Sequence, residues 1–360
     1  MSLTDFRTLG RSGLLVSPFA LGTMTFGPAD WGADEETSRA IFDAYREAGG
    51  NFIDTADIYS GGESERMVGK FIADTGSRDE IVLATKFGFN ASASSIGASQ
   101  GGGRNPNAGG AGEKNIYRAL DGSLERLGTD YIDLYWMHIW DGVTPVAEIV
   151  QTLGDLVRAG KIRYYGFSDM PAWVGAKAAA IAAERGVPGP IAMQLEYSLV
   201  ARGVEAEHFP AARDGGMGVM PWSPLAGGFL TGKYKQGDTS DTGRLSGDNP
   251  FGDSKFTDRN WTILNATEAV AQELGHPVAQ VALAWTLARP GVASTLVGAS
   301  KVSQLESNLA ATEIVLSAEQ LAKLDEASAP TPGFSAMLTS CGTRKMVHGG
   351  HAVSGWDEQQ

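Results

Sequence analysis

The chain has 360 residues, of which 42% are hydrophobic and 20% charged, a composition typical of a globular protein with a large core. Its formal net charge of −13 argues against nucleic acid or an anionic membrane surface as a general partner. The single cysteine, Cys341, excludes an intrachain disulfide and a cysteine-based metal site, and no signal-like or membrane-spanning apolar run is present. We therefore expect a cytoplasmic protein.

The predicted elements begin with a hairpin over residues 6–17, where two short extended runs flank a Gly-Arg-Ser-Gly turn. Eight strand-like runs follow, at residues 19–23, 51–55, 81–86, 131–138, 162–168, 191–194, 217–221 and 294–297. Helical patterns separate or follow them, at residues 35–48, 63–74, 114–127, 144–159, 171–185, 203–214, 263–289, 301–312 and 317–327. This alternation predicts an α/β fold with parallel strands closed into a (β/α)8 TIM barrel, with the hairpin as a plug at its bottom.

The domain organisation predicted from this order is one unit over residues 1–360. The barrel takes about residues 17–328, and a C-terminal extension takes about 329–360. Two long polar stretches, residues 90–112 and 233–260, each leave the C-terminal end of a strand, so we expect long loops at that face. Each stretch can be read as a disordered insertion or as a functional loop. For 233–260, which contains aromatic and basic residues, an ordered clamp is favoured.

Four chemically active side chains lie at or just past the ends of three successive predicted strands. Asp54 and Tyr59 follow the second strand, Lys86 ends the third, and His138 ends the fourth. Strand ends of a barrel meet at one rim, so a carboxylate, a phenol, an ammonium and an imidazole can share a pocket. Lys86 is expected to lower the pKa of Tyr59, and these groups are those that carbonyl reduction needs.

Several other functions find no support in the motifs. Residues 227–233 fit the start of a phosphate-binding P-loop, but Tyr234 replaces the hydroxyl residue that holds Mg²⁺. No Gly-x-Gly-x-x-Gly follows a strand, and no Gly-x-Ser-x-Gly elbow is present. The neighbouring His348 and His351 lack an identifiable third ligand, so no metal site is predicted.

The chain resembles the aldo-keto reductases over nearly its whole length. Seven segments carry the resemblance in the right order: residues 22–27, 51–59, 84–86, 131–138, 160–168, 222–233 and 298–304. The long loops and the glycine-rich 222–233 segment make it similar to the bacterial members related to potassium-channel β subunits. By this resemblance Asp54, Tyr59, Lys86 and His138 match the catalytic tetrad. The pattern Asp-Thr-Ala-x-x-Tyr selects Asp54 over the nearby Asp57.

The same resemblance implies a nicotinamide cofactor held along the rim. The residues implied at its nicotinamide end are Gly22, Thr23, Met24, Asp54, Ser168, Asp169, Gln194 and Trp222, which would stack on the ring. Those implied at the pyrophosphate are Ser223, Pro224, Leu225, Gly227 and Lys233, with Arg244 closing the clamp. Those implied at the adenosine end are Gly298, Ser300, Lys301, Gln304 and Asn308.

Some positions depart from the family pattern. Asp169 stands where asparagine is frequent, so it can accept a hydrogen bond from a carboxamide but cannot donate one. Trp222 replaces the more usual tyrosine or phenylalanine, and Ser307 stands where many members carry glutamate toward adenine. The usual arginine near the ribose phosphate is replaced by the Ser300-Lys301 pair. Lys301 can pair with a 2′-phosphate, which favours NADPH (NADP⁺) over NADH.

The function implied is NADPH-dependent reduction of an aldehyde or ketone to the alcohol, with Tyr59 as general acid. The alternatives are an NADP(H)-binding sensor or regulatory subunit with slow turnover, and a barrel lyase or hydrolase without nicotinamide. The expected partner is a small carbonyl compound, and the sequence leaves the identity of that compound and the oligomeric state open. The residues predicted to contact the substrate are Trp31, Tyr59, His138 and Trp140.

Overall fold

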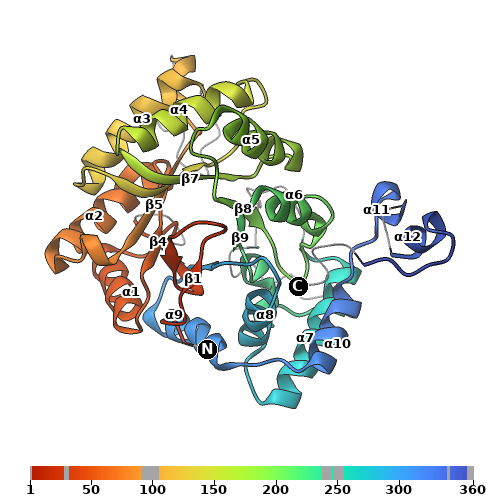
Figure 1. Cartoon of the computed structure of the whole chain (residues 1–360). Helices are drawn as coiled ribbons and strands as arrows, with labels where there is room; N and C mark the ends of the chain where they lie inside the picture. Colours follow the sequence, from red (N-terminus) through yellow and green to blue (C-terminus); the bar gives the residue numbers. More distant parts are fainter. Residues whose placement is uncertain are drawn as a thin grey trace.

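Eight parallel strands form the centre of the molecule, and helices surround them (Figure 1). The computed structural model describes residues 2–27, 32–90, 105–236, 245, 255–338 and 341–354. In sheet order the strands are β10 (Thr295–Val297), β3 (Phe19–Gly22), β4 (Phe52–Asp54), β5 (Val82–Phe87), β6 (Ile132–Met137), β7 (Ile162–Ser168), β8 (Ala192–Glu196) and β9 (Gly218–Trp222). Each strand overlaps one of the predicted runs.

The two edge strands of this sheet approach each other and nearly close it. The backbone N–H of Val219, on β9, donates to Gly291 O at 2.9 Å, and the N–H of Ala293 donates to Val219 O at 2.9 Å. These two hydrogen bonds join β9 to the segment that leads into β10. The predicted (β/α)8 barrel is confirmed.

The helices of the outer ring mostly follow the predicted ranges. They are α1 (Glu35–Glu47), α2 (Glu63–Thr75), α3 (Glu113–Leu127), α4 (Val146–Arg158), α5 (Ala172–Arg185), α6 (His208–Gly215), α7 (Asp258–Leu274), α8 (Val278–Leu287), α9 (Val302–Leu309) and α10 (Ala318–Ser328). Short 3₁₀ turns are η1 (Tyr59–Gly62), η2 (Arg78–Glu80), η3 (Pro106–Ala108), η4 (Gly203–Glu205), η5 (Ala226–Thr231) and η6 (Ala310–Glu313). In the described part of the chain, every helix is too short or too polar to cross a membrane.

One predicted helix was wrong, because residues 263–289 form parts of two helices. Gly275 adopts a left-handed conformation (φ +69°) and ends α7, and Pro277 precedes the first residue of α8. Glycine is favoured at a left-handed C-terminal cap, and proline is favoured at a helix start because it lacks a backbone N–H. The apolar periodicity continues across the break and hides it.

The N-terminal hairpin closes the bottom of the barrel. Strands β1 (Arg7–Thr8) and β2 (Leu15–Val16) pair antiparallel. Leu9 and Val16 are fully buried against a layer of side chains from the barrel strands, including Phe52 and Trp136. The backbone N–H of Arg11 donates to the carbonyl of Gly216, just before β9, at 2.8 Å. The hairpin therefore packs at the N-terminal end of the strands, as predicted, and leaves the opposite end for a site.

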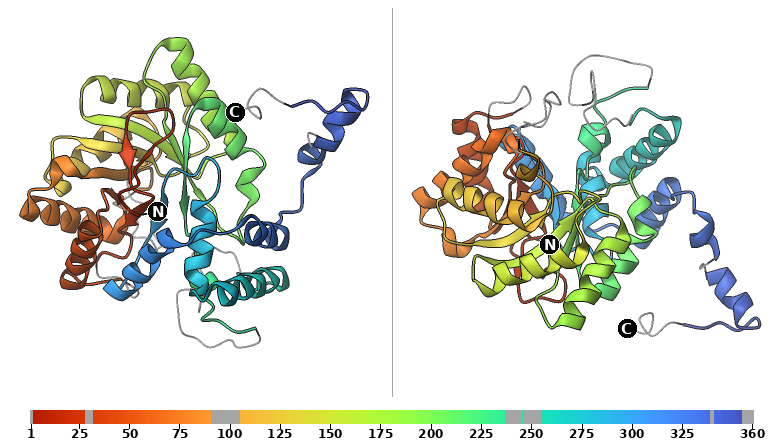
Figure 2. Two further views of the ribbon diagram at one scale, coloured as in Figure 1. Left: turned by 60° about the horizontal axis from the view of Figure 1, so that its bottom comes forward. Right: turned by 90° about the horizontal axis from the view of Figure 1, so that it is seen from above.

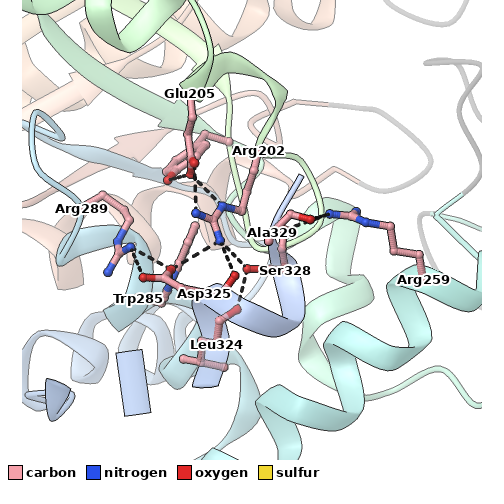
Figure 3. A network of polar contacts seen from close by, with 10 residues as sticks. Arg202, Glu205, Arg259, Trp285, Arg289, Leu324, Asp325, Ser328 and Ala329 are labelled. Atoms are coloured by element: carbon pink, nitrogen blue, oxygen red, sulfur yellow. Dashed lines mark hydrogen bonds and ion pairs between the residues drawn. The ribbon is translucent and has the colours of Figure 1, made fainter. Parts of the chain in front are cut away.

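A polar network fixes the last barrel helix, α10, to the body (Figure 3). The guanidinium of Arg202 donates to Ser328 Oγ at 2.7 Å, and Asp325 accepts from the indole of Trp285 and from Arg289, both at 2.9 Å. Beyond α10, the short helices α11 (Phe334–Leu338) and α12 (Cys341–Val347) project away from the barrel (Figure 2). The division into one domain with a C-terminal extension stays a prediction.

Candidate active site

Three of the four predicted tetrad residues are in direct contact at the C-terminal ends of β4 and β5. Asp54 is the last residue of β4, Lys86 lies near the end of β5, and Tyr59 opens η1 just beyond β4. The Lys86 ammonium donates to Asp54 Oδ1, and also to the Tyr59 hydroxyl and the carbonyl of Thr55, each at 3.1 Å. All three tetrad side chains are buried. Lys86 is therefore the centre of the assembly.

His138, the fourth member, directly follows β6 and packs edge-on between two aromatic rings. Its ring centroid lies 5.7 Å from that of Tyr59 and 4.9 Å from that of Phe89, with interplanar angles of 84° for both pairs. Burial, and then the charge of Lys86, lower the pKa of His138 well below its ordinary value. The imidazole is therefore neutral at pH 7 and can donate one N–H to a substrate oxygen.

The pKa of Tyr59 shifts in the opposite direction to the one expected. Burial raises the pKa of Tyr59 above its ordinary value and outweighs Lys86, whose charge acts in the expected downward direction. The Asp54 carboxylate also raises the pKa of Tyr59 and so offsets part of the effect of the Lys86 charge. Burial opposes the charge on Lys86, but Asp54 and Tyr59 raise the pKa of Lys86 above its ordinary value. The site thus holds a charged lysine beside a protonated tyrosine.

The residues predicted for the carboxamide lie across the mouth of the barrel on β7, β8 and β9. Gln194 uses its side-chain amide to donate to Asp54 Oδ2 at 3.1 Å, so both Asp54 oxygens have a partner. Ser168 ends β7, and its buried hydroxyl has no hydrogen-bond partner within the described ranges. Trp222, at the end of β9, donates its indole N–H to Asp169 Oδ1 at 3.0 Å. An unsatisfied buried hydroxyl fits a site that receives a polar group.

The segment predicted for the pyrophosphate has an unusual backbone. Ser223, Ala226, Gly227 and Gly228 all adopt positive φ, between 51° and 95°. Hydrogen bonds inside the turn hold this backbone, because the N–H groups of Ala226 and Gly227 donate to Ser223 O and Ser223 Oγ, at 2.8 and 3.1 Å. A Cβ added to Gly228 would lie 3.1 Å from the Lys233 ammonium, so this cation sits against the turn. The predicted Pro224 and Leu225 lie within the same turn, and the Lys233 ammonium beside it is a charged donor that fits a phosphate group.

The loops that follow β3 and β10 carry the remaining cofactor candidates. Gly22 ends β3, Met24 lies in the loop after it, and Gly298, Ser300 and Lys301 connect β10 to α9, which bears Gln304 and Asn308. The Thr25 hydroxyl donates to Ala299 O at 2.7 Å and joins the two loops. Gln304 accepts from the N–H and the hydroxyl of Ser300, at 3.0 and 3.2 Å. Thr23 turns its hydroxyl to the carbonyl of Asp54, at 3.2 Å, and so supports the tetrad.

The predicted substrate residues are only partly placed. Trp31, together with the clamp residue Arg244, lies outside the described residues. Trp140 donates its indole N–H to Thr144 O at 3.2 Å and packs edge-to-face on Trp173, with ring centroids 5.2 Å apart. Sequence reasoning missed Trp173 and Phe89, the ring against His138. Their signal was an aromatic residue shortly after a strand end, the position that places a side chain at the rim.

A second cluster of polar side chains lies between the barrel strands and helices α2 and α3. We call it the outer cluster, and it consists of Asp57, Glu65, Thr85 and Arg126. Glu65, on α2, accepts from the Thr85 hydroxyl at 2.5 Å and from Arg126 of α3 at 2.6 Å. Asp57 Oδ1 is buried and has no hydrogen-bond partner in the part of the chain that is described. Burial, and then the charge of Glu65, raise the pKa of Asp57 to about 8.

Comparison with known proteins gives one family model and relatives that are similar over most of their length. The model of the Aldo/keto reductase family matches residues 18–329. A probable voltage-gated potassium channel subunit beta of Oryza sativa subsp. japonica is 35% identical over 316 residues, 86% of this chain and 92% of that protein. The uncharacterized oxidoreductase YrpG of Bacillus subtilis is 38% identical over 339 residues, 91% and 97% of the two chains. Norsolorinic acid reductase B of Aspergillus parasiticus is 34% identical over 337 residues, 92% and 86%.

Proposed function

Because the chain belongs to the aldo/keto reductase family, we propose that it is an NADPH-dependent oxidoreductase that reduces an aldehyde or ketone to the alcohol. Tyr59 is the general acid. The observation that carries the proposal is the buried Lys86 ammonium, which contacts both the Asp54 carboxylate and the Tyr59 hydroxyl. Relatives named as an oxidoreductase and as a reductase support the same class of reaction.

The cofactor in this proposal is held by polar, aromatic and basic side chains at the mouth of the barrel. Ser168 and Gln194 would hold the carboxamide, Trp222 the ring face, and the turn from Ser223 to Gly228 with Lys233 the pyrophosphate. The bound nicotinamide would supply the hydride. Everything else in the reaction is done by the side chains of the tetrad.

The tetrad supplies the proton and stabilises charge. As the carbonyl oxygen becomes negative, the neutral His138 donates a hydrogen bond and Tyr59 transfers its proton to that oxygen. The phenolate left behind lies 3.1 Å from the Lys86 ammonium, which stabilises it in a site with little water. Asp54, held by Gln194, keeps that ammonium in place. Burial keeps the proton on Tyr59 until the oxygen develops charge.

The test compares two tyrosines that are both buried. Tyr59→Phe removes only the hydroxyl, so we expect kcat to fall about 10²–10⁴-fold while cofactor affinity changes little. Tyr135→Phe is the matched control, because the Tyr135 hydroxyl is also buried but has no hydrogen-bond partner within the described chain. Carbonyl-dependent oxidation of NADPH measures kcat, and fluorescence titration measures affinity. Undiminished turnover by Tyr59→Phe contradicts the proposal.

The preference for NADPH over NADH is proposed from Lys301. This residue is exposed just before α9, where its ammonium can pair with a 2′-phosphate. Replacing it with glutamine is expected to weaken NADPH binding several-fold and to leave NADH binding nearly unchanged. Equal effects on the two cofactors would show that Lys301 does not select between them.

The partner proposed is a small carbonyl compound, and the setting proposed is the cytoplasm. A second candidate function comes from relatives named as potassium channel β subunits, which favour an NADP(H)-binding regulatory subunit with slow turnover. Retention of cofactor through purification, together with negligible turnover on a panel of aldehydes, ketones and quinones, distinguishes this candidate from the enzyme.

A further inference from the structure

Asp169 and Trp222 form a bonded pair that spans the mouth of the barrel. Asp169 directly follows β7, Trp222 ends β9, and β8 lies between these two strands. The indole N–H of Trp222 donates to Asp169 Oδ1 at 3.0 Å. Asp169 takes a left-handed backbone conformation (φ +43°), which aspartate tolerates better than most residues. This backbone and the indole together hold the carboxyl group in one position.

The residue Asp169 is partly exposed at the surface, and its carboxyl group lies within electrostatic reach of Tyr59 and Lys86. Its negative charge raises the pKa of Tyr59, and the charge of Lys86 acts on Asp169 in turn. The other charged neighbour is Glu196 at the end of β8, whose carboxylate pairs with Lys255 at 3.0 Å. Asp169 thus places a carboxylate beside Ser168, in the region proposed for the nicotinamide.

From this placement we propose that Asp169 selects the redox state of the cofactor, so that the site binds NADP⁺ more tightly than it would with a neutral residue there. The oxidised nicotinamide ring carries a positive charge that the reduced ring lacks, so a fixed carboxylate attracts only the oxidised form. The hydrogen bond from Trp222 holds one oxygen of that carboxylate in place. This inference rests on the proposed function, because it requires a nicotinamide at this site.

The selection depends on pH, because Asp169 must be ionised to exert it. Burial of the carboxyl group raises the pKa of Asp169 to about 6, and the hydrogen bond from Trp222 partly opposes that rise. The carboxylate therefore predominates above pH 7 and the neutral acid predominates below pH 5. The preference for NADP⁺ is present at the higher pH and disappears as the pH falls through 6.

The experiment measures dissociation constants for NADP⁺ and NADPH by isothermal titration at pH 5, 6, 7 and 8. For the wild type, the ratio of the NADPH constant to the NADP⁺ constant should rise about 3–10-fold between pH 5 and pH 8. Asp169→Asn keeps the size of the side chain and an oxygen that accepts from Trp222. Its ratio should stay at the low-pH value throughout, with NADPH affinity nearly unchanged.

Two further variants separate a local effect from a general one. Glu196→Gln removes the neighbouring carboxylate, so its ratio should rise as far as that of the wild type but with a midpoint at lower pH, because Glu196 raises the pKa of Asp169. Trp222→Phe keeps an aromatic ring but removes the indole N–H, and its ratio should fall between those of the wild type and Asp169→Asn. A wild-type ratio that does not change with pH, or an unchanged ratio in Asp169→Asn, overturns the inference and leaves the proposed function standing. Failure of the wild type to bind either dinucleotide overturns both.

Discussion

Two buried polar groups occupy opposite faces of the same strands and behave differently. The tetrad lies inside the barrel, and the outer cluster lies between the barrel and helices α2 and α3. Successive side chains of a strand point to opposite faces, so Lys86 enters the tetrad while its neighbour Thr85 enters the outer cluster. One short stretch of backbone thus supplies both groups.

The two groups differ in how completely their carboxyl groups are paired. Asp54 has a partner on each oxygen, Lys86 on one and Gln194 on the other. Asp57 keeps one buried oxygen without a partner in the described part of the chain, and the nearby Glu65 charge raises its pKa further. Burial raises the pKa of both acids, but at Asp54 the charge of Lys86 opposes that rise, whereas at Asp57 the charge of Glu65 adds to it. Only the first arrangement can hold a charged lysine for catalysis.

The largest effect expected from this difference is on turnover. Asp54→Asn removes the charge that holds Lys86, so kcat should fall about 10²–10⁴-fold. Asp57→Asn replaces a neutral acid with a neutral amide, so kcat should stay within a few-fold of the wild type. The measurement is NADPH oxidation with one carbonyl substrate at pH 7 for both variants. Similar losses in the two variants would mean that Asp57 belongs to the catalytic group.

The tetrad could be predicted from the sequence because its members lie at strand ends within local motifs. The spacing of Asp54 and Tyr59, and the position of Lys86 at the end of a strand, suffice once the strands form a barrel. The outer cluster could not be predicted, because Glu65 and Arg126 come from two helices. Their meeting depends on how those helices are rotated against the barrel, which apolar periodicity does not specify.

Backbone conformation was the other part that the sequence did not reveal. Asp169, Ser223 and Ala226 adopt positive φ although none is glycine, so no residue type signals these turns. The contact between Asp169 and Trp222 joins two positions that depart from the family pattern and lie 53 residues apart in the chain. Each could be noticed separately in the sequence, but only the barrel brings them together.

The second prediction concerns stability and uses the same pair of carboxyl groups. The pKa of Asp57 is about 8 in the folded protein and about 4 in an unfolded chain, so the folded state binds an extra proton between these values. Stability contributed by this group is complete below pH 4 and is lost as the pH rises through 8. Asp57→Asn lacks this dependence. Relative to wild type, the variant should gain on the order of a few kcal/mol in unfolding free energy between pH 5 and pH 8.5.

Urea unfolding at pH 5, 7 and 8.5 measures the free energy of unfolding of wild type and Asp57→Asn. Subtracting one value from the other cancels the pH dependence of the titratable groups that the two proteins share. The comparison is Asp141→Asn, which removes a carboxylate that accepts from the Ala111 N–H at 2.8 Å and from the Thr144 hydroxyl at 2.6 Å. These hydrogen bonds outweigh burial and lower the pKa of Asp141, so its replacement should destabilise the protein at pH 7 and pH 8.5. A parallel pH dependence in wild type and Asp57→Asn would show that Asp57 is ionised when folded.

The smallest effect tests why Asp57 takes up a proton. Glu65→Gln keeps an oxygen for the Thr85 hydroxyl but removes the neighbouring negative charge, which leaves the cations Arg126 and Arg118 near Asp57. The pKa of Asp57 should then fall. We compare Glu65→Gln with the double variant that also carries Asp57→Asn. The stability that Asp57 contributes should be lost about one pH unit lower in this pair than in the pair of wild type and Asp57→Asn. Glu125→Gln, exposed on α3, is the control and should not move that midpoint. An unmoved midpoint in Glu65→Gln would assign the proton on Asp57 to burial alone.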